Sequence, residues 1–165
     1  MKKNIFIISL SLLVFILQSS CSYESDPLDA FNSGNYKQSF SLWKNRADTG
    51  DNTAQNYIGI HYYLGLGVEQ NIKQSFYWYE KSAKSGNSDA QRNLGALYES
   101  GALGQRDFEN AYLWLYASYK QGNTNASKTL QTISGQLSPG RVHMLKQRAK
   151  QYVLHDKVDP EYDDF

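Results

Sequence analysis

The chain has 165 residues, with 17 basic and 16 acidic side chains and a formal net charge of +1 at pH 7. This near-neutral balance creates no strong field that would attract nucleic acid or anionic lipid, so we expect no nucleic-acid partner. The single cysteine excludes an internal disulfide framework. The length suits one domain with a sizeable core.

The N-terminal segment predicts secretion. Lys2 and Lys3 precede an apolar run over residues 5–17, and small residues follow it. This order of basic, apolar and small residues is typical of a signal peptide, here residues 1–20. The apolar run is shorter than the ~20 residues that a membrane-spanning helix needs. Removal of the signal peptide leaves 15 basic and 16 acidic residues.

Cys21 directly follows these small residues. Its context, with Leu17 nearby, resembles the lipid-accepting cysteine of a bacterial lipoprotein, although Gln18 stands where such sequences usually carry leucine. The resemblance implies acylation of Cys21, with residues 21–27 as a lipid-attached linker. Ser22 resembles the outer-membrane-sorted class, so we expect a periplasmic, lipid-anchored protein. An ordinary signal peptide followed by an incidental thiol is the alternative.

Two helices are expected at the front of the folded region. Asp26 and Pro27 combine a capping side chain with a proline in the first turn, which predicts a short helix. Its partner is expected from Tyr36 to about Thr49.

Ser41 and Lys44, in the second of these helices, match the Ser-x-x-Lys element of penicillin-recognising enzymes. The companion Ser-Asp-Asn and Lys-Thr-Gly elements are missing from the chain. A motif with only two fixed positions has low specificity. The favoured interpretation is therefore that Ser41 and Lys44 lie on the exposed side of a helix. The alternative is an envelope enzyme, a β-lactam-recognising or cell-wall hydrolase that uses these two side chains.

The middle of the chain repeats with a period of 36 residues. Periods of this length indicate stacked helical pairs, because no single pair can bury its apolar face alone. The equivalent positions are Gly50, Gly86 and Gly122; Ala54, Ala90 and Ala126; Ile58, Leu94 and Leu130; Gly59 and Gly95; Tyr62 and Tyr98; Gly65 and Gly101; Trp78 and Trp114.

Each unit predicts two helices. In the first unit, Asn52 or Thr53 can cap the first helix, which a glycine-containing turn at Gly65 ends. The second helix is expected over about residues 71–85, before a glycine suited to a C-cap. The next unit follows the same plan over residues 88–122.

The third copy starts at Ala126 and departs from the pattern after Ile133. Ser138 and Pro139 open another helix, which is expected to run to about Leu154 and to cap the array. Residues 156–165 contain five acidic residues and one lysine, and we interpret them as a solvated acidic tail.

Four consecutive aromatic residues lie in the second helix of the first unit. Phe76 and Tyr79 share one helix face, Trp78 lies beside it, and Tyr77 falls on a different side. The run is therefore predicted to be core rather than a ligand cage, with only Tyr77 at the surface. His61 occupies an apolar position of the repeat and is interpreted as a packing residue.

The repeat pattern is similar to the Sel-one-like repeat (SLR), a tetratricopeptide-related helical hairpin. The 36-residue period fits the SLR better than the 34 residues of the tetratricopeptide repeat. The resemblance covers about residues 30–155. It implies an all-α fold, an α-solenoid of antiparallel helix pairs over residues 28–155 with a C-terminal capping helix. The pattern reads Ala54…Ile58-Gly59…Tyr62…Gly65-Leu66-Gly67-Val68…Trp78-Tyr79…Lys81…Ala83…Gly86.

Two positions depart from the family pattern. Asn71 replaces the usual acidic residue, which Asp107 keeps in the next copy. Leu103 and Gly104 stand where the family has Gly-Val, so we expect the second inter-helix turn to differ from the first.

The SLR resemblance also implies a partner-binding surface, because first helices line the concave side of such arrays. Exposed aliphatic and aromatic side chains mixed with charges of both signs suit a protein partner. Ile60 and Tyr63 form the pair that we expect to contribute most. The predicted concave residues are Asn56, Ile60, Tyr63, Arg92, Ala96, Glu99, Lys128 and Thr132.

The motifs predict no catalytic set, no metal site and no cofactor. The leading hypothesis is therefore a non-enzymatic, periplasmic protein–protein interaction module. Small secreted SLR lipoproteins resemble immunity proteins that neutralise a secreted antibacterial effector, such as a phospholipase. A scaffold of an envelope complex and the envelope enzyme described above are the alternatives.

Overall fold

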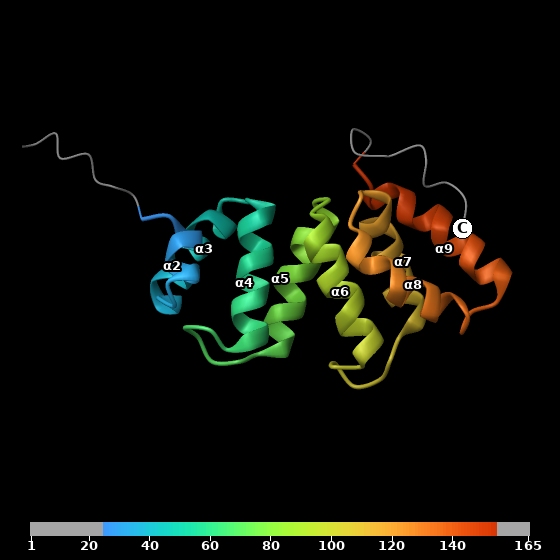
Figure 1. The fold of residues 1–165 in the computed structure, drawn as a ribbon, viewed down its shortest axis with the longest axis horizontal. Coiled ribbons are helices and arrows are strands. Elements are labelled where there is room, and N and C mark those ends of the chain that lie inside the picture. Colours follow the sequence, from blue (N-terminus) through green and yellow to red (C-terminus); the bar gives the residue numbers. More distant parts are fainter. Residues whose placement is uncertain (1–24, 155–165) are drawn as a thin grey trace, which may run out of the picture.

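The computed structural model describes residues 25–154, and Figure 1 shows their helices following one another along the long axis of the molecule. This part of the chain contains no β-strand. The predicted all-α solenoid is therefore confirmed. The helices are α2 (Pro27–Asn32), α3 (Tyr36–Asp48), α4 (Asn52–Leu64), α5 (Ile72–Lys84), α6 (Ser88–Ser100), α7 (Phe108–Lys120), α8 (Ser127–Ser134) and α9 (Pro139–Ala149), with short 3-10 helices η1 (Thr124–Ala126) and η2 (Lys150–Tyr152).

Several sequence predictions concern residues outside this range. The signal peptide (1–20), Cys21 with the first part of the proposed linker, and the acidic tail (156–165) lie beyond the described residues. Within residues 25–154, no helix has the length and apolar character needed to cross a bilayer.

Polar side chains begin the repeated helices at equivalent positions. Asp51 and Asn87, which are 36 residues apart, cap α4 and α6 by accepting the backbone N–H three residues ahead. Asn71 and Asp107 cap α5 and α7 in the same way, so the exchange of Asp for Asn preserves the cap. The prediction that Asn52 or Thr53 caps α4 is wrong by one or two residues, because Asp51 carries the extended backbone and the side-chain bond of an N-cap.

Glycines hold the two helices of each unit close together. A Cβ atom added at Gly59 on α4 would lie 2.4 Å from Cδ1 of Tyr79 on α5. A Cβ at Gly95 on α6 would lie 2.7 Å from Cγ of Leu115 on α7. Real Cβ contacts are not that short, so the side chains of the second helices occupy space that only glycine leaves open.

Aromatic side chains join each unit to the one before it. Tyr62 on α4 packs edge-on against Phe40 on α3, with ring centroids 5.5 Å apart. Tyr98 on α6 makes the same contact with Phe76 on α5, also at 5.5 Å. These contacts repeat because their residues are 36 positions apart, and they build one continuous core from nearest-neighbour interfaces.

The aromatic run has the predicted burial. Trp78 and Tyr79 are buried, Phe76 is half-buried, and the Tyr77 side chain is 51% exposed. The Trp78 ring also lies beneath the ammonium groups of Lys44 and Lys81, at 5.2 and 5.3 Å from its centroid. The interpretation of the run as core with one surface residue is confirmed.

The two inter-helix turns differ, as expected. Gly67 has φ +70° and lies against the backbone of Tyr36, where a Cβ would be 2.5 Å from the carbonyl carbon. The equivalent residue is Leu103, which is exposed and has no positive φ, while Gly104 takes φ +132°. A leucine cannot make the close backbone approach of Gly67, so the second turn follows another path.

The end of the array is less regular than the sequence suggests. α9 starts after the Ser138 cap as predicted, but it ends at Ala149 rather than near Leu154. The chain then folds back as η2, where the Tyr152 ring packs on Trp114 at 4.4 Å. The backbone carbonyl of Tyr152 accepts a hydrogen bond from Nε2 of the buried Gln91.

Candidate functional site

The predicted concave residues on α4 differ in their exposure. Asn56 is buried, and its Oδ1 accepts a hydrogen bond from Nδ2 of Asn93 at 3.0 Å, which ties α4 to α6. Ile60 is half-buried and packs against the core. Tyr63 is 40% exposed. On this helix Tyr63 is the predicted residue best placed for contact with a partner.

The predicted residues on α6 and α8 form a more open and polar surface. Arg92 and Glu99 are half-buried and bring charges of both signs to α6, while Ala96 between them is exposed. On α8, Lys128 and Thr132 are exposed. The Thr132 hydroxyl donates to the backbone carbonyl of Lys128.

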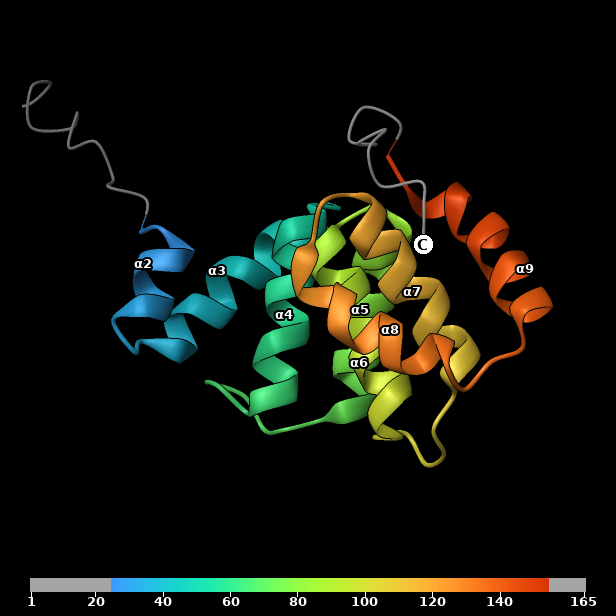
Figure 2. The same ribbon diagram turned by 45° about the vertical axis from the view of Figure 1, so that its right-hand side comes forward.

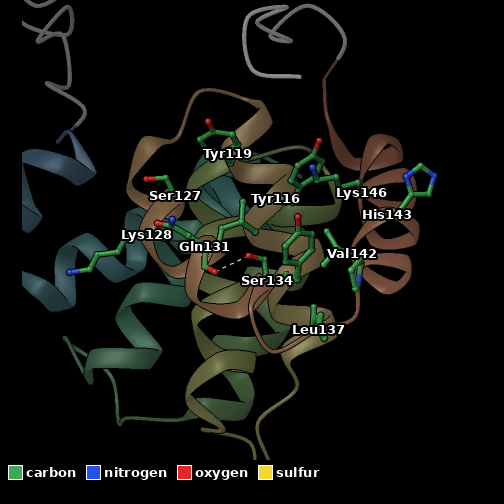
Figure 3. Close-up of a pocket in the computed structure, with 13 residues that line it drawn as sticks. Tyr116, Tyr119, Ser127, Lys128, Gln131, Ser134, Leu137, Val142, His143 and Lys146 are labelled. Carbon is green, nitrogen blue, oxygen red and sulfur yellow. Dashed lines mark hydrogen bonds between the residues drawn. The ribbon is translucent and has the colours of Figure 1, made fainter. Parts of the chain in front are cut away.

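A second candidate site is a cavity of about 820 Å³ between α7, α8 and α9, hereafter the α7–α8–α9 cavity. Of the residues proposed from sequence, Lys128 alone is part of its lining. Figure 3 shows Val142 and Lys146 of α9 directed toward Tyr116, whereas Lys128 and His143 extend outward. The lining residues are Tyr112, Tyr116, Tyr119, Ser127, Lys128, Leu130, Gln131, Ser134, Leu137, Pro139, Val142, His143 and Lys146.

The cavity exists because α8 lacks the helix that covers its counterparts. In the first two units, α4 packs along α5, and α6 packs along α7. In the third, α8 and α9 both pack on α7 and make almost no contact with each other. Figure 2 shows α9 well separated from α8, with α7 between and behind them.

Two residues of α8 explain this departure. Gln131 occupies the register of Gly59 and Gly95, so a long side chain stands where the other units need none. Ser134 occupies the register of Tyr62 and Tyr98, so no ring covers the preceding helix. The two features that bring a second helix close to α4 and α6, a glycine and an aromatic ring, are thus both absent from the equivalent positions of α8.

The floor of the cavity is aromatic. Tyr112 and Tyr116 stack with centroids 5.9 Å apart and planes inclined by 10°. Burial, with a smaller contribution from Tyr116, raises the pKa of Tyr112 to about 12, so this phenol is neutral at physiological pH. The Lys146 ammonium lies 5.5 Å from the centroid of Tyr116. Tyr112 and Tyr116 are 2% and 8% exposed, so both rings belong to the hydrophobic core beneath the cavity.

Sequence reasoning did not identify this cavity. The repeat pattern predicts a structural role for Tyr112 and its neighbours. It also predicts that the third unit follows the pattern up to Ile133. The available signal was one turn earlier, at Gln131, where the small residue of the repeat is lost.

The other candidate chemical groups are engaged in structural contacts. His61 is buried, and its Nδ1 donates to the Leu66 carbonyl at 2.6 Å, so the predicted packing role is confirmed. Burial lowers the pKa of His61, against the opposing effect of this hydrogen bond. Ser41 is exposed, and Lys44 is bound by Asp48 at 2.6 Å. Among residues 25–154, no group of three or more His, Cys, Asp or Glu side chains could hold a metal ion.

Comparison with known proteins gives the family. The Sel1 repeat model matches residues 52–87 and 88–123, the two regular units. A sequence comparison with curated proteins finds no match.

Two solved structures share the fold. The crystal structure of c5321, a protective antigen present in uropathogenic Escherichia coli strains, is described as an SLR fold and superposes with a TM-score of 0.68 at 22% identity over 79% of this chain. The crystal structure of a Sel1 repeat protein from Oxalobacter formigenes superposes with a TM-score of 0.63, at 25% sequence identity over 76% of this chain. This chain spans 31% and 54% of those two chains, less than two-thirds of either. The chain therefore contains two Sel1 repeats within a solenoid of the SLR fold, and Sel1 repeats imply a protein–protein interaction module.

Proposed function

We propose that this protein is a non-enzymatic interaction module, tethered by lipid at Cys21 on the periplasmic side of the outer membrane. In its most specific form the proposal is an immunity protein that binds and neutralises a secreted antibacterial effector, such as a phospholipase. The signal-like segment and the lipoprotein-like cysteine support the location. The Sel1 repeats support a protein partner.

The observation that carries the proposal is the surface of the first helices of the two regular units. An exposed aromatic residue, Tyr63, stands on α4, and Arg92 and Glu99 bring opposite charges to α6. Tyrosine and arginine are enriched among residues that dominate binding energy at protein interfaces. The SxxK pair gives little support to the enzyme alternative, because Asp48 and the Trp78 ring already engage Lys44.

A matched pair of tyrosine variants tests partner binding. The mature chain, residues 22–165, is used to capture proteins from envelope extracts, alongside Tyr63→Ala and Tyr77→Ala. Both tyrosines are about equally exposed, but Tyr77 is on α5. We expect the wild-type chain to capture one protein in stoichiometric amount. This protein should be lost with Tyr63→Ala and retained with Tyr77→Ala. Equal retention by both variants would contradict a site on the first helices.

The cellular role needs a separate experiment. A strain lacking the gene is competed against rival and sibling cells that deliver effectors into the periplasm, with complementation by wild type, Tyr63→Ala or Cys21→Ser. An immunity protein predicts killing of the deletion strain, rescued by wild type and poorly rescued by Tyr63→Ala. Membrane release of Cys21→Ser, with loss of labelling by a radioactive fatty acid, would support the anchor. Survival of the deletion strain under every effector tested would instead favour the scaffold role.

A further inference from the structure

Arg92 on α6 differs from its repeat counterpart in what it contacts. Asn56, 36 residues earlier, accepts the hydrogen bond from Asn93 that ties α4 to α6. The equivalent pair in the next unit is Arg92 of α6 with Thr129 of α8. In the described part of the chain no hydrogen bond joins these two side chains. Arg92 therefore does not perform the role of Asn56 in tying neighbouring units together.

The guanidinium of Arg92 is half-buried and has no counterion within residues 25–154. Its Nε is buried without a hydrogen-bond partner. Asp89, three residues before it on α6, instead accepts a hydrogen bond from Nδ2 of Asn123 at 2.9 Å. Arg92 is thus a partly desolvated cation that no ion pair in this range neutralises. The other basic side chains of this range that are half-buried or buried each have an interacting group, and they are Lys44, Lys120 and Lys146.

Arg92 belongs to the surface of the first helices. Burial raises the pKa of the Tyr79 phenol; nearby Tyr63 raises it further, and the charge of Arg92 lowers it. Tyr63 of α4 and Arg92 of α6 therefore both lie near this buried ring of α5. Ala96, one turn after Arg92, is exposed and has a short side chain. A partner side chain that reaches Arg92 would therefore enter the same surface that presents Tyr63.

The chemistry of a guanidinium favours a carboxylate. Arginine stays charged at physiological pH, and its planar group can form two parallel N–H···O bonds with one carboxylate. Because Nε is buried, the Nη groups are the part of Arg92 that a ligand can reach. Folding has already removed part of the water around this cation, so an ion pair formed here is less screened than one at an open surface. An acidic side chain is the complementary group.

We propose that Arg92 binds the carboxylate of an aspartate or glutamate side chain of the protein partner. The inference rests on the proposed function, because it takes the surface of the first helices to be the partner-binding site. It specifies the chemistry that the partner presents there. Tyr63 supplies aromatic contact area, and Arg92 selects a negative charge.

A capped amino acid tests this chemistry on the wild-type protein. The isotope-labelled mature chain, residues 22–165, is titrated with N-acetyl-glutamate N-methylamide and followed by proton–nitrogen NMR spectra. The glutamine analogue is the uncharged control, and inorganic phosphate is a second anion. We expect saturable shifts of the Arg92 Nε–H signal with the glutamate compound alone, and Arg92→Lys assigns that signal by its loss. Equal responses to the glutamate and glutamine compounds, or tighter binding of phosphate, would overturn the proposal.

Variants test the contact in the complex. The envelope protein that the wild-type chain captures is titrated against each variant by calorimetry. Arg92→Glu should weaken its binding at least tenfold. Arg92→Lys should weaken it less, because lysine keeps the charge without the planar fork. The matched control Arg148→Glu, at an exposed position of α9, should have no effect.

A charge exchange identifies the partner residue. Replacement of one acidic residue of the captured protein by arginine should restore its binding to Arg92→Glu, which a merely structural role of Arg92 would not allow. Circular dichroism establishes that each variant is folded. Failure of every such exchange, with Arg92→Glu folded, would contradict the proposal.

Two outcomes separate this inference from the proposed function. Loss of the captured protein with Tyr63→Ala but not with Arg92→Glu would leave the proposed function standing and remove Arg92 as a contact. A glutamate response at Arg92 without any captured protein would support the carboxylate site and contradict the proposed function.

Discussion

The imidazole of His61 is buried and contacts three elements of the fold. Its Nδ1 donates to the Leu66 carbonyl in the turn after α4, and its Nε2 lies 3.3 Å from the Ser39 hydroxyl of α3. That hydroxyl has one hydrogen, which the nearer Pro27 carbonyl accepts at 2.8 Å. The neutral ring therefore joins α4 to its own turn while it fills the space between α2 and α3.

This burial predicts a pH-dependent stability. The folded-state pKa of His61 lies below its usual value, so the unfolded chain binds more protons as the pH falls through about 6.5. The free energy of unfolding should consequently decrease from pH 7 to pH 5.5. Urea unfolding followed by tryptophan fluorescence measures it at each pH.

His61→Leu is the variant that isolates this effect. Leucine occupies the equivalent position 97, so its shape is accepted in the repeat. The variant should lose the His61 part of the pH dependence, at a cost of roughly 1–3 kcal/mol because the Leu66 carbonyl loses its partner. His143→Leu, at an exposed position of α9, should keep the wild-type dependence. A slope unchanged in His61→Leu would mean that other groups cause it.

At the scale of elements, the helix pairs depend on glycines that permit close approach. Gly95→Ala places a Cβ 2.7 Å from Leu115, within a helix whose residues 111–120 are all buried. In a helix, alanine is about 1 kcal/mol more favourable than glycine. Overpacking a tight core, however, lowers the free energy of unfolding by about 1–3 kcal/mol. We expect net destabilisation, because Leu115 has no free space into which to move.

Gly140→Ala is the matched control for this prediction. Gly140 lies in the first turn of α9, and beyond its chain neighbours and its own helix backbone nothing lies within 4 Å of its added Cβ. This variant should be neutral or stabilised by up to about 1 kcal/mol, which thermal unfolding of both proteins measures. Stabilisation of Gly95→Ala to the same extent would show that the α6–α7 interface adapts readily.

The same elements show how far sequence reasoning reaches. The 36-residue period, the Asp26 and Ser138 caps and the buried aromatic run were predictable because each depends on local spacing. The path of α9 was not, because it follows from a tertiary contact: α9 packs on α7 and makes almost no contact with α8. The burial of Asn56 was missed for a related reason, since its bond to Asn93 joins neighbouring units.

At the scale of the whole molecule, the array has a centre and two unequal ends. α7 packs against α6, α8, α9 and η1, and ten consecutive residues of it are buried. α2 has six residues, packs mainly on α3, and buries only Pro27 and Ala30. In an array stabilised by nearest-neighbour interfaces, local opening costs least where an element has fewest neighbours.

Hydrogen exchange should therefore be graded along the chain. We expect α7 amides to exchange most slowly, α6 and α5 next, and α2 fastest, when the mature chain is followed by mass spectrometry at neutral pH. Protection of equal strength from α2 to α9 would mean that the array opens as one cooperative unit, despite the uneven distribution of its contacts.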